Sequence, residues 1–288
     1  MKFALCGIAG KENLYIREWV EHHIRCGFDN IIIYTTVPEE NPKAVLFDYI
    51  MKGIVKIIPW YHQVPEDSFF QDAVQCPAYN DCLDNYGKDF DWIAFFDIDE
   101  FLEVDCGNIH LWFNLMQQYT QFDVVLVHWY TMNSDGNLYY ENKPVQERFT
   151  YHNNYNWGSD NITVDCIFKS IVNTKTTHRF ISSPHKPYGV SGREKDQLQV
   201  CSTEGIMVYG FFTYALPWFV HSHARLKHYI TKSLTEYLNR KLDHVAWEKS
   251  GMANPDVIKK QFTEANDWTP AHELIFNTYV LRGPDVNI

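Results

Sequence analysis

The fold is decided by a short apolar stretch that ends in three carboxylates, Trp92-Ile93-Ala94-Phe95-Phe96-Asp97-Ile98-Asp99-Glu100-Phe101-Leu102. An apolar strand of this length and aromatic content usually lies inside a sheet that is covered on both faces. On an extended backbone the side chains of Asp97 and Asp99 leave the same face, where they repel each other unless a cation lies between them. Hard oxygen ligands favour Mg²⁺ or Mn²⁺, whose shells are completed by water and substrate phosphates. The stretch predicts either such a metal site or, as for any Asp-x-Asp, a simple strand cap.

The composition limits the function classes. With 288 residues, of which 45% are hydrophobic, the chain can form one large α/β domain with a well-filled core. The formal net charge of -11 argues against a nucleic-acid partner, because phosphate backbones attract domains rich in Lys and Arg. The seven cysteines include no C-x-x-C pair, so we expect reduced thiols in a cytoplasmic protein.

Strand and helix patterns alternate over the first half of the chain. Strands are predicted at residues 3–9, 30–34, 53–60, 92–102 and 122–129, and helices at 12–27, 42–51, 69–86 and 109–119. Three βα units in succession imply a parallel sheet. A nucleotide is the ligand expected beyond the carboxyl ends of such strands.

The sequence pattern changes after about residue 137. Short strand-like pieces are predicted at 147–151, 166–172, 206–214 and 218–221, and helices at 226–242 and 255–262. The fold class expected is therefore α/β, with a mixed sheet flanked by helices and a C-terminal part of β pieces and covering helices. We expect a catalytic domain over residues 1–240, with a helical extension over 241–288 packed on the same domain.

Several separated motifs occur in a characteristic order. They are Lys11-Glu12 with Tyr15 to His23, Gln75 with Ala78 to Cys82, Asp91 to Leu102, Glu147-Arg148-Phe149, Lys169 to Val172, Pro184-His185 and His228 to Ser233. Over residues 3 to about 240 the chain resembles metal-dependent nucleotide-sugar glycosyltransferases of the GT-A fold. The resemblance is to the family 92 and family 2-like group of capsule and polysaccharide gene products.

This resemblance implies an inverting transfer of a sugar from a nucleoside diphosphate donor, a UDP-sugar in the first place, to a hydroxyl of a saccharide or lipid-linked saccharide. It implies Mn²⁺ or Mg²⁺ held by Asp97, Asp99 and His228, with Asp99 as the direct ligand and Asp97 acting through water or the ribose. A cation in contact with the departing diphosphate stabilises the charge that develops there. The donor-binding residues implied are Ala9, Lys11, Glu12, Thr35, Gln75, Tyr79, Asn80, Asp97, Ile98 and Lys232.

An inverting transfer needs a general base for the acceptor hydroxyl, and a carboxylate in a partly desolvated pocket is the usual choice. Glu147, next to the charge of Arg148, is the first candidate and Asp135 is the second. The alternatives are an ion pair at a strand edge for Glu147 and an ordinary turn residue for Asp135.

Other functions stay open at this level. A carbohydrate-binding relative without catalysis could keep the fold, because a fold alone does not fix function. A nucleotidyltransferase would use the same metal and sheet, although Gly7-Ile8-Ala9-Gly10-Lys11 is a weak version of its phosphate loop. Aromatic residues and lysines between Trp247 and Trp268 would allow peripheral contact with the inner face of a membrane, and an ordinary packed helix explains them equally well.

Overall fold

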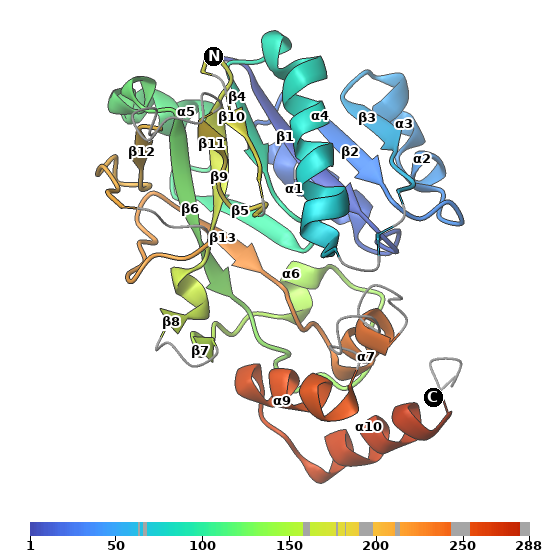
Figure 1. The fold of residues 1–288 in the computed structure, drawn as a ribbon. Coiled ribbons are helices and arrows are strands. Elements are labelled where there is room, and N and C mark those ends of the chain that lie inside the picture. The colour runs from blue at the N-terminus through green and yellow to red at the C-terminus, as the bar shows by residue number, and fades with distance from the viewer. Residues whose placement is uncertain are drawn as a thin grey trace. The chain divides into compact units, whose positions relative to one another are not determined.

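A computed structural model describes residues 1–62, 64–65, 68–157, 162–176, 178–181, 183–189, 198–210, 214–242 and 254–282 (Figure 1). The chain forms two compact units, one made of residues 1–129 and 165–227 and the other of residues 130–164 and 228–288. Residue 240, where a boundary was expected, lies inside the second unit. The division into 1–240 and 241–288 stays a prediction.

A mixed sheet forms the centre of the first unit. Its strands run in the order β3 (Val55–Pro59), β2 (Asn30–Thr35), β1 (Phe3–Ala9), β4 (Trp92–Phe95), β9 (Phe168–Asn173), β6 (Val124–Thr131), β13 (Ala224–His228) and β5 (Glu100–Val104), with β12 (Val200–Cys201) also paired to β6. The first four strands are parallel, as the βα pattern predicts. Strand β9 is antiparallel to both β4 and β6. The predicted α/β class with a mixed sheet is confirmed.

Helices cover both faces of β1, and all residues of this strand are buried. Cys6 and Ile8 pack in the cluster that includes α4 (Cys76–Tyr86). Gly7 points to the other face, where an added Cβ would lie 2.9 Å from Cη2 of Trp19 on α1 (Ile16–Arg25). Because successive side chains of a strand leave opposite faces, α4 and α1 flank the sheet from opposite sides (Figure 1). Because helices cover both faces of β1, its side chains are apolar throughout.

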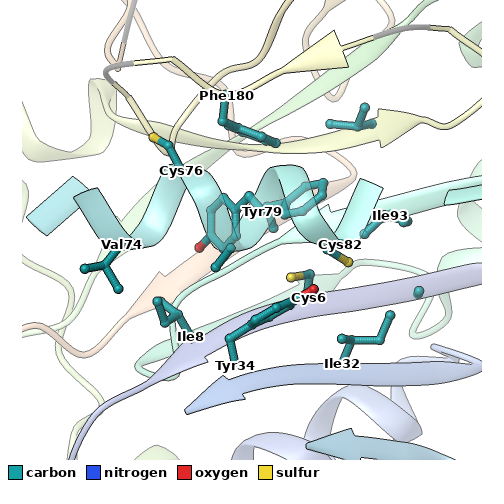
Figure 2. Packing of buried hydrophobic residues seen from close by; sticks show 14 residues of the cluster. Cys6, Ile8, Ile32, Tyr34, Val74, Cys76, Tyr79, Cys82, Ile93 and Phe180 are labelled. Atoms are coloured by element: carbon teal, nitrogen blue, oxygen red, sulfur yellow. The ribbon is translucent and has the colours of Figure 1, made fainter. Parts of the chain in front are cut away.

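Aromatic and sulfur side chains fill the core under α4. Tyr79 lies with its ring centroid 4.8 Å from that of Phe95 and 5.2 Å from that of Phe180 (Figure 2). Cys6 and Cys82 pack in the same cluster and are fully buried. All seven cysteines lie in the described part of the chain, and all are free thiols.

Some predicted elements of the first unit differ in the structure. The helix expected at 42–51 is two short helices, α2 (Pro42–Val45) and α3 (Phe47–Met51), because the backbone turns at Leu46 to bury that side chain completely. The helix expected at 69–86 begins as a π-helical turn, Gln71–Gln75, before α4. Helix α5 (Ile109–Leu115) is followed by a 3-10 turn, Gln117–Gln121. The remaining strands there form a small hairpin of β10 (His178–Arg179) and β11 (Tyr188–Gly189).

Two strand predictions near the end of the first unit are wrong for the residues described there. Within 206–210 and 214–221 the pairing is limited to single bridges, Met207 to Cys201 and Ala215 to Ile167. Residues 211–213 lie outside the described part. An aromatic run forms a strand only where a neighbouring strand offers a matching edge, and here much of the run is exposed, with Tyr209 78% accessible.

The second unit is mostly helical. It contains α6 (Val145–Arg148), α7 (Leu234–Leu242), α9 (Pro255–Ala265), α10 (Pro270–Arg282) and a small hairpin of β7 (Asn156–Trp157) and β8 (Ile162–Thr163). Helices α7, α9 and α10 bury Leu238, Ile258, Phe262 and Phe276 in one cluster. The chain at 147–151 was expected as a strand, but α6 occupies its start because the Val145 and Phe149 side chains, four residues apart, are both buried.

The helix predicted over 226–242 is also wrong at its start. Residues up to His228 form the end of strand β13, and α7 begins only at Leu234. In β13 the burial alternates between consecutive residues, which is the period of a strand. Residues 243–253, which include Trp247 from the predicted membrane-contact segment, lie outside the described part. Nowhere in the described ranges is a helix both long and apolar enough to cross a membrane.

Candidate functional site

The two aspartates lie in a tight turn, and not on one extended strand as expected. Strand β4 ends at Phe95, β5 begins at Glu100, and the Glu100 backbone N–H donates to the Asp97 carbonyl at 3.0 Å. The Glu100 carboxylate folds back and accepts from the Asp97 backbone N–H at 2.7 Å. Ile98 between them is 2% exposed and faces Gly7. Burying Ile98 closes the turn, so the two carboxylates are not placed by strand alternation.

Three donors hold the Asp97 carboxylate. Its Oδ1 accepts from Gln75 Nε2 at 2.8 Å and from the Tyr79 hydroxyl at 3.3 Å, and its Oδ2 accepts from Lys169 Nζ at 2.8 Å. Gln75 also donates to the Tyr79 hydroxyl at 3.0 Å. We call Gln75, Tyr79 and Lys169 the Asp97 cradle. The cradle leaves the Asp97 side chain 31% exposed.

The elements around β4 bring the cradle together. The π-helical turn and α4 supply Gln75 and Tyr79, and Tyr79 lies one helical turn after Gln75. Lys169 comes from β9, whose Ser170 is the register partner of Phe95 at the end of β4. Because Asp97 follows that strand end by two residues, the antiparallel pairing of β4 and β9 sets Lys169 beside it.

Lys169 connects two buried carboxylates. It is fully buried, with Nζ 3.8 Å from Glu100 Oε2 in addition to its contact with Asp97. Glu100 is fully buried too, and its Oε1 accepts from Trp129 Nε1 at 2.7 Å. A buried charge is tolerated when it is paired and hydrogen-bonded in this way.

The surroundings shift the pKa values of Asp97 and Glu100 in opposite directions. Burial acts to raise the pKa of Asp97, but the Lys169 ammonium outweighs it, so this pKa lies below its ordinary value. Burial raises the pKa of Glu100 well above its ordinary value, although Lys169 opposes the shift. Burial acts to lower the pKa of Lys169, but Asp97 and Glu100 together raise it. Asp97 is therefore an ionised acceptor with fixed orientation.

Other predicted donor residues gather at the carboxyl ends of the parallel strands. Ala9 and Thr35 are register partners at the ends of β1 and β2, and the Phe96 N–H donates to the Cys6 carbonyl, so the acidic turn follows at the same edge. Lys11 follows β1 with a positive φ of 59°, and the Glu12 carbonyl accepts the first hydrogen bonds of α1 from Tyr15 and Ile16.

Two predicted donor residues have structural contacts in the first unit. The Asn80 side chain makes two hydrogen bonds with the backbone of Phe180, at 2.8 and 3.0 Å. The side chain of Ile98 is buried. Ile98 could therefore meet a ligand only through its backbone.

Four predicted site residues belong to the second unit. His228 ends β13 and is 4% exposed, and Lys232 is 5% exposed in the loop before α7 with a positive φ of 53°. The helix predicted over 226–242 would place Lys232 one turn after His228, but here the two residues are joined by a loop. Asp135 accepts from the Thr150 N–H and hydroxyl and from the Tyr151 N–H through both carboxylate oxygens. Glu147 is exposed on α6.

The expected charge partner of Glu147 has another role. Arg148 is buried and makes a two-pronged ion pair with Glu236, at 2.7 and 2.9 Å. Its Nε also donates to the Lys143 carbonyl at 3.1 Å. Arg148 therefore serves the packing of α6 on α7, and its ion-pair partner is Glu236.

The acidic turn suits a divalent cation in chemistry but only in part in geometry. Carboxylate oxygens are the ligands that Mg²⁺ and Mn²⁺ prefer. In the described ranges, however, no group of three or more His, Cys, Asp or Glu side chains is arranged to hold a metal ion. The Asp97 charge is already balanced by Lys169. Asp99 is 3% exposed, and its role as a cation ligand stays a prediction.

Sequence reasoning assigned no function to Lys169 or Glu100. One signal was present, since Lys169 is a single charged residue within the buried run Phe168 to Val172. A lysine in such a run needs a buried counter-ion, and the acidic turn of the neighbouring strand is where it finds one.

Comparisons with known proteins point to one family. No curated protein matches the chain. Solved structures similar to it include S. aureus TarS 1–349 (10% identity, TM-score 0.40, covering 91% of this chain and 72% of that one) and S. aureus TarS (12%, 0.42, 98% and 46%). Another is S. aureus TarS 1–349 in complex with UDP, with 14% identity and a TM-score of 0.34. That match covers 46% of this chain and only 37% of the TarS chain. The family model described as Glycosyltransferase family 92 matches residues 2–207, which is more than half of the chain, so the protein belongs to glycosyltransferase family 92.

Proposed function

We propose that this protein transfers a sugar from a nucleoside diphosphate sugar to a hydroxyl group of a saccharide or lipid-linked saccharide, with inversion at the transferred carbon. A UDP-sugar is the first donor to test, since a TarS structure contains UDP. The observation that carries the proposal is the Asp97 cradle. It fixes an ionised, partly exposed carboxylate at the carboxyl edge of the parallel strands, which is where α/β sheets bind nucleotides.

The residues at this edge would bind different parts of the donor. Ala9 and Thr35 lie where a nucleoside would meet the ends of β1 and β2. Asp97 can accept a hydrogen bond from a sugar hydroxyl, because ionised carboxylates are strong acceptors. When bound, Mn²⁺ or Mg²⁺ would stabilise negative charge on the leaving diphosphate. Asp99 and His228 are proposed as its ligands, and Lys232 as a phosphate contact.

The base remains a choice between two carboxylates. Both carboxylate oxygens of Asp135 accept hydrogen bonds from the backbone and hydroxyl of residues 150–151, and such contacts suit a residue that holds a loop in place. Glu147 is exposed and no such set surrounds it in the hydrogen bonds described. We therefore propose Glu147 as the base that accepts the proton of the acceptor hydroxyl.

The test is metal-dependent nucleotide binding and turnover. We expect UDP to bind the parent protein with Mn²⁺ and not with EDTA, measured by calorimetry. Asp99→Asn keeps the shape but removes a charge, so turnover should fall on the order of 10²-fold. The same substitution at exposed Asp89 should change neither quantity. Equal, metal-independent UDP affinity in the parent and Asp99→Asn would overturn the proposal.

The released product separates the rival functions. A glycosyltransferase releases the nucleoside diphosphate, whereas a nucleotidyltransferase releases pyrophosphate, and a carbohydrate-binding relative releases neither. Free thiols suit a reducing compartment, so we propose the cytoplasm, with peripheral contact at the inner membrane face if the acceptor is lipid-linked. Complete recovery in the supernatant of cells that make such an acceptor would contradict the membrane contact.

A further inference from the structure

The loops between β12 and β13 carry an uncharged run of sequence. Between Gly205 and Ala224 the chain contains no Asp, Glu, Asn, Gln, Lys or Arg, although 21% of the whole chain is charged. In the described parts of this run, residues 205–210 and 214–224, five large apolar side chains are between 38% and 78% exposed: Ile206, Tyr209, Tyr214, Trp218 and Phe219. We call these five residues the apolar patch. Soluble proteins rarely expose such a patch unless it meets a partner.

The central sheet of the first unit holds both loops of the patch. Val208 from one loop and Leu216 from the other pack into one hydrophobic cluster with strands β6 and β9. The Val208 N–H donates to the Val200 carbonyl at 2.8 Å, and the Leu216 N–H donates to the Cys166 carbonyl at 3.0 Å. Because these two anchors are fixed to the same part of the sheet, the exposed side chains that flank them are held at one part of the surface.

Two rings connect the patch to the acidic turn. The ring centroid of Tyr214 lies 6.4 Å from that of His185, and the His185 centroid lies 5.8 Å from that of Trp129. The Trp129 indole N–H donates to the Glu100 carboxylate at 2.7 Å. A partner that covers the patch would therefore lie beside the turn that holds Asp97.

The chemistry of the patch fits the interface of a lipid bilayer. Tyr and Trp are enriched at the headgroup level, where an apolar ring and its polar tip both find a suitable environment. A saccharide or a protein partner is bound in part by hydrogen bonds from charged and amide side chains, and residues 205–224 contain none. A second copy of the chain would bring together two proteins of net charge -11. The described parts of the loops are not helical, so their backbone polar groups cannot enter the hydrocarbon and the contact must be shallow.

We propose that the apolar patch binds the headgroup region of a lipid bilayer and thereby brings the acidic turn to an acceptor saccharide that is attached to a lipid. The proposal rests on the function proposed above and selects the lipid-linked acceptor within it. It places the membrane contact at the patch and not at the segment 247–268. In the described part of that segment, Trp268 packs in the helical cluster with Phe262, and its indole N–H donates to Glu273 at 2.7 Å.

The experiment is flotation of the full chain with vesicles of phosphatidylcholine, with and without phosphatidylglycerol. Because the patch is uncharged and the whole chain is acidic, we expect binding to phosphatidylcholine alone, no gain from the anionic lipid and no loss in high salt. The double variant Tyr209→Ser with Phe219→Ser should bind roughly tenfold more weakly, because two exposed rings no longer lose contact with water at the membrane. Phe47→Ser, at a ring that is 63% exposed on α3, should bind like the parent.

Trp218 gives a second measurement that stays decisive if the double variant does not fold, as judged by circular dichroism. A lipid brominated near the headgroup end of its acyl chains should quench the fluorescence of the parent more than one brominated near the chain ends. Trp218→Phe, which keeps an aromatic ring, should lose most of this difference.

Three results would overturn the proposal: parental vesicle binding by the folded double variant, binding that requires the anionic lipid, or self-association through the patch without vesicle binding. Vesicle binding needs no turnover, so the two proposals fail separately. A parent that turns over a UDP-sugar but does not bind vesicles refutes the membrane contact alone. A parent that binds vesicles through the patch but neither binds UDP nor turns over refutes the proposed function instead.

Discussion

The buried ion pair of the second unit gives a quantitative test of the fold. Arg148 Nη1 and Nη2 donate to the two oxygens of Glu236 at 2.7 and 2.9 Å, and the two side chains are only 3% and 5% exposed. Glu236 also accepts from the N–H and hydroxyl of Ser233, while its own N–H donates to the Ser233 hydroxyl at 3.4 Å. This reciprocal capping box starts helix α7.

Arg148→Met should be strongly destabilising. It leaves the Glu236 carboxylate buried without its counter-ion, and breaking one side of such a pair costs about 3–5 kcal/mol. Replacing both partners, as in Arg148→Met with Glu236→Leu, removes the uncompensated charge, so we expect the double variant to be more stable than Arg148→Met alone. It should still lose about 1 kcal/mol from the missing cap.

The assay is urea unfolding of the parent, both single variants and the double variant, evaluated as a double-mutant cycle. Lys143→Met is a suitable control, because the Lys143–Glu141 ion pair is 2.8 Å long but 63% and 51% exposed, and it should leave the midpoint unchanged. A loss below about 1 kcal/mol in Arg148→Met, or strictly additive single effects, would refute the reasoning.

Two further predictions concern the first unit. Gly7→Ala would put a Cβ 2.9 Å from Trp19 Cη2 and 3.2 Å from the Phe96 carbonyl oxygen, so we expect about 1–3 kcal/mol of destabilisation in urea unfolding, whereas Gly87→Ala, 3.9 Å from its nearest neighbour, should cost little. Burial lowers the pKa of His128 to about 3. Below its ordinary pKa of about 6.5 this histidine binds a proton in the unfolded chain but not in the folded chain. The free energy of unfolding should therefore fall by roughly 1.4 kcal/mol for each unit by which the pH is lowered between about pH 6 and pH 3. His128→Gln should show a correspondingly shallower decline, and an equal slope would contradict the assignment.

Local sequence patterns predicted the regular part of the fold well. Strands β1 and β2 and helix α1 were expected near their observed bounds, because continuous burial and a 3.6-residue period are properties of the segment itself. The failures occurred where tertiary contacts override local preference. Leu46 interrupts a helix in order to enter the core, and the residues up to His228 pair as a strand although the following run is helical.

The candidate site could be predicted only in part for the same reason. Asp97 and Asp99 were found from their position after an apolar run, but their geometry depends on Ile98 turning into the core. Lys169 lies 72 residues from Asp97 and meets it only because β9 pairs antiparallel to β4. A sequence shows the charge of Lys169 but not the strand order that gives it a partner.

The strand order also explains why this acidic turn can be rigid. Two donors to Asp97 belong to elements packed against β4: Tyr79 on α4, whose ring contacts Phe95, and Lys169 on β9, which pairs with β4. The third, Gln75, ends the π-helical turn that leads into α4. A carboxylate held by side chains that are themselves buried loses little freedom when a ligand binds, which is the condition for preorganised recognition. Asp97 is therefore a partly exposed acceptor with a fixed orientation, and Lys169 is the buried counter-ion that keeps it so.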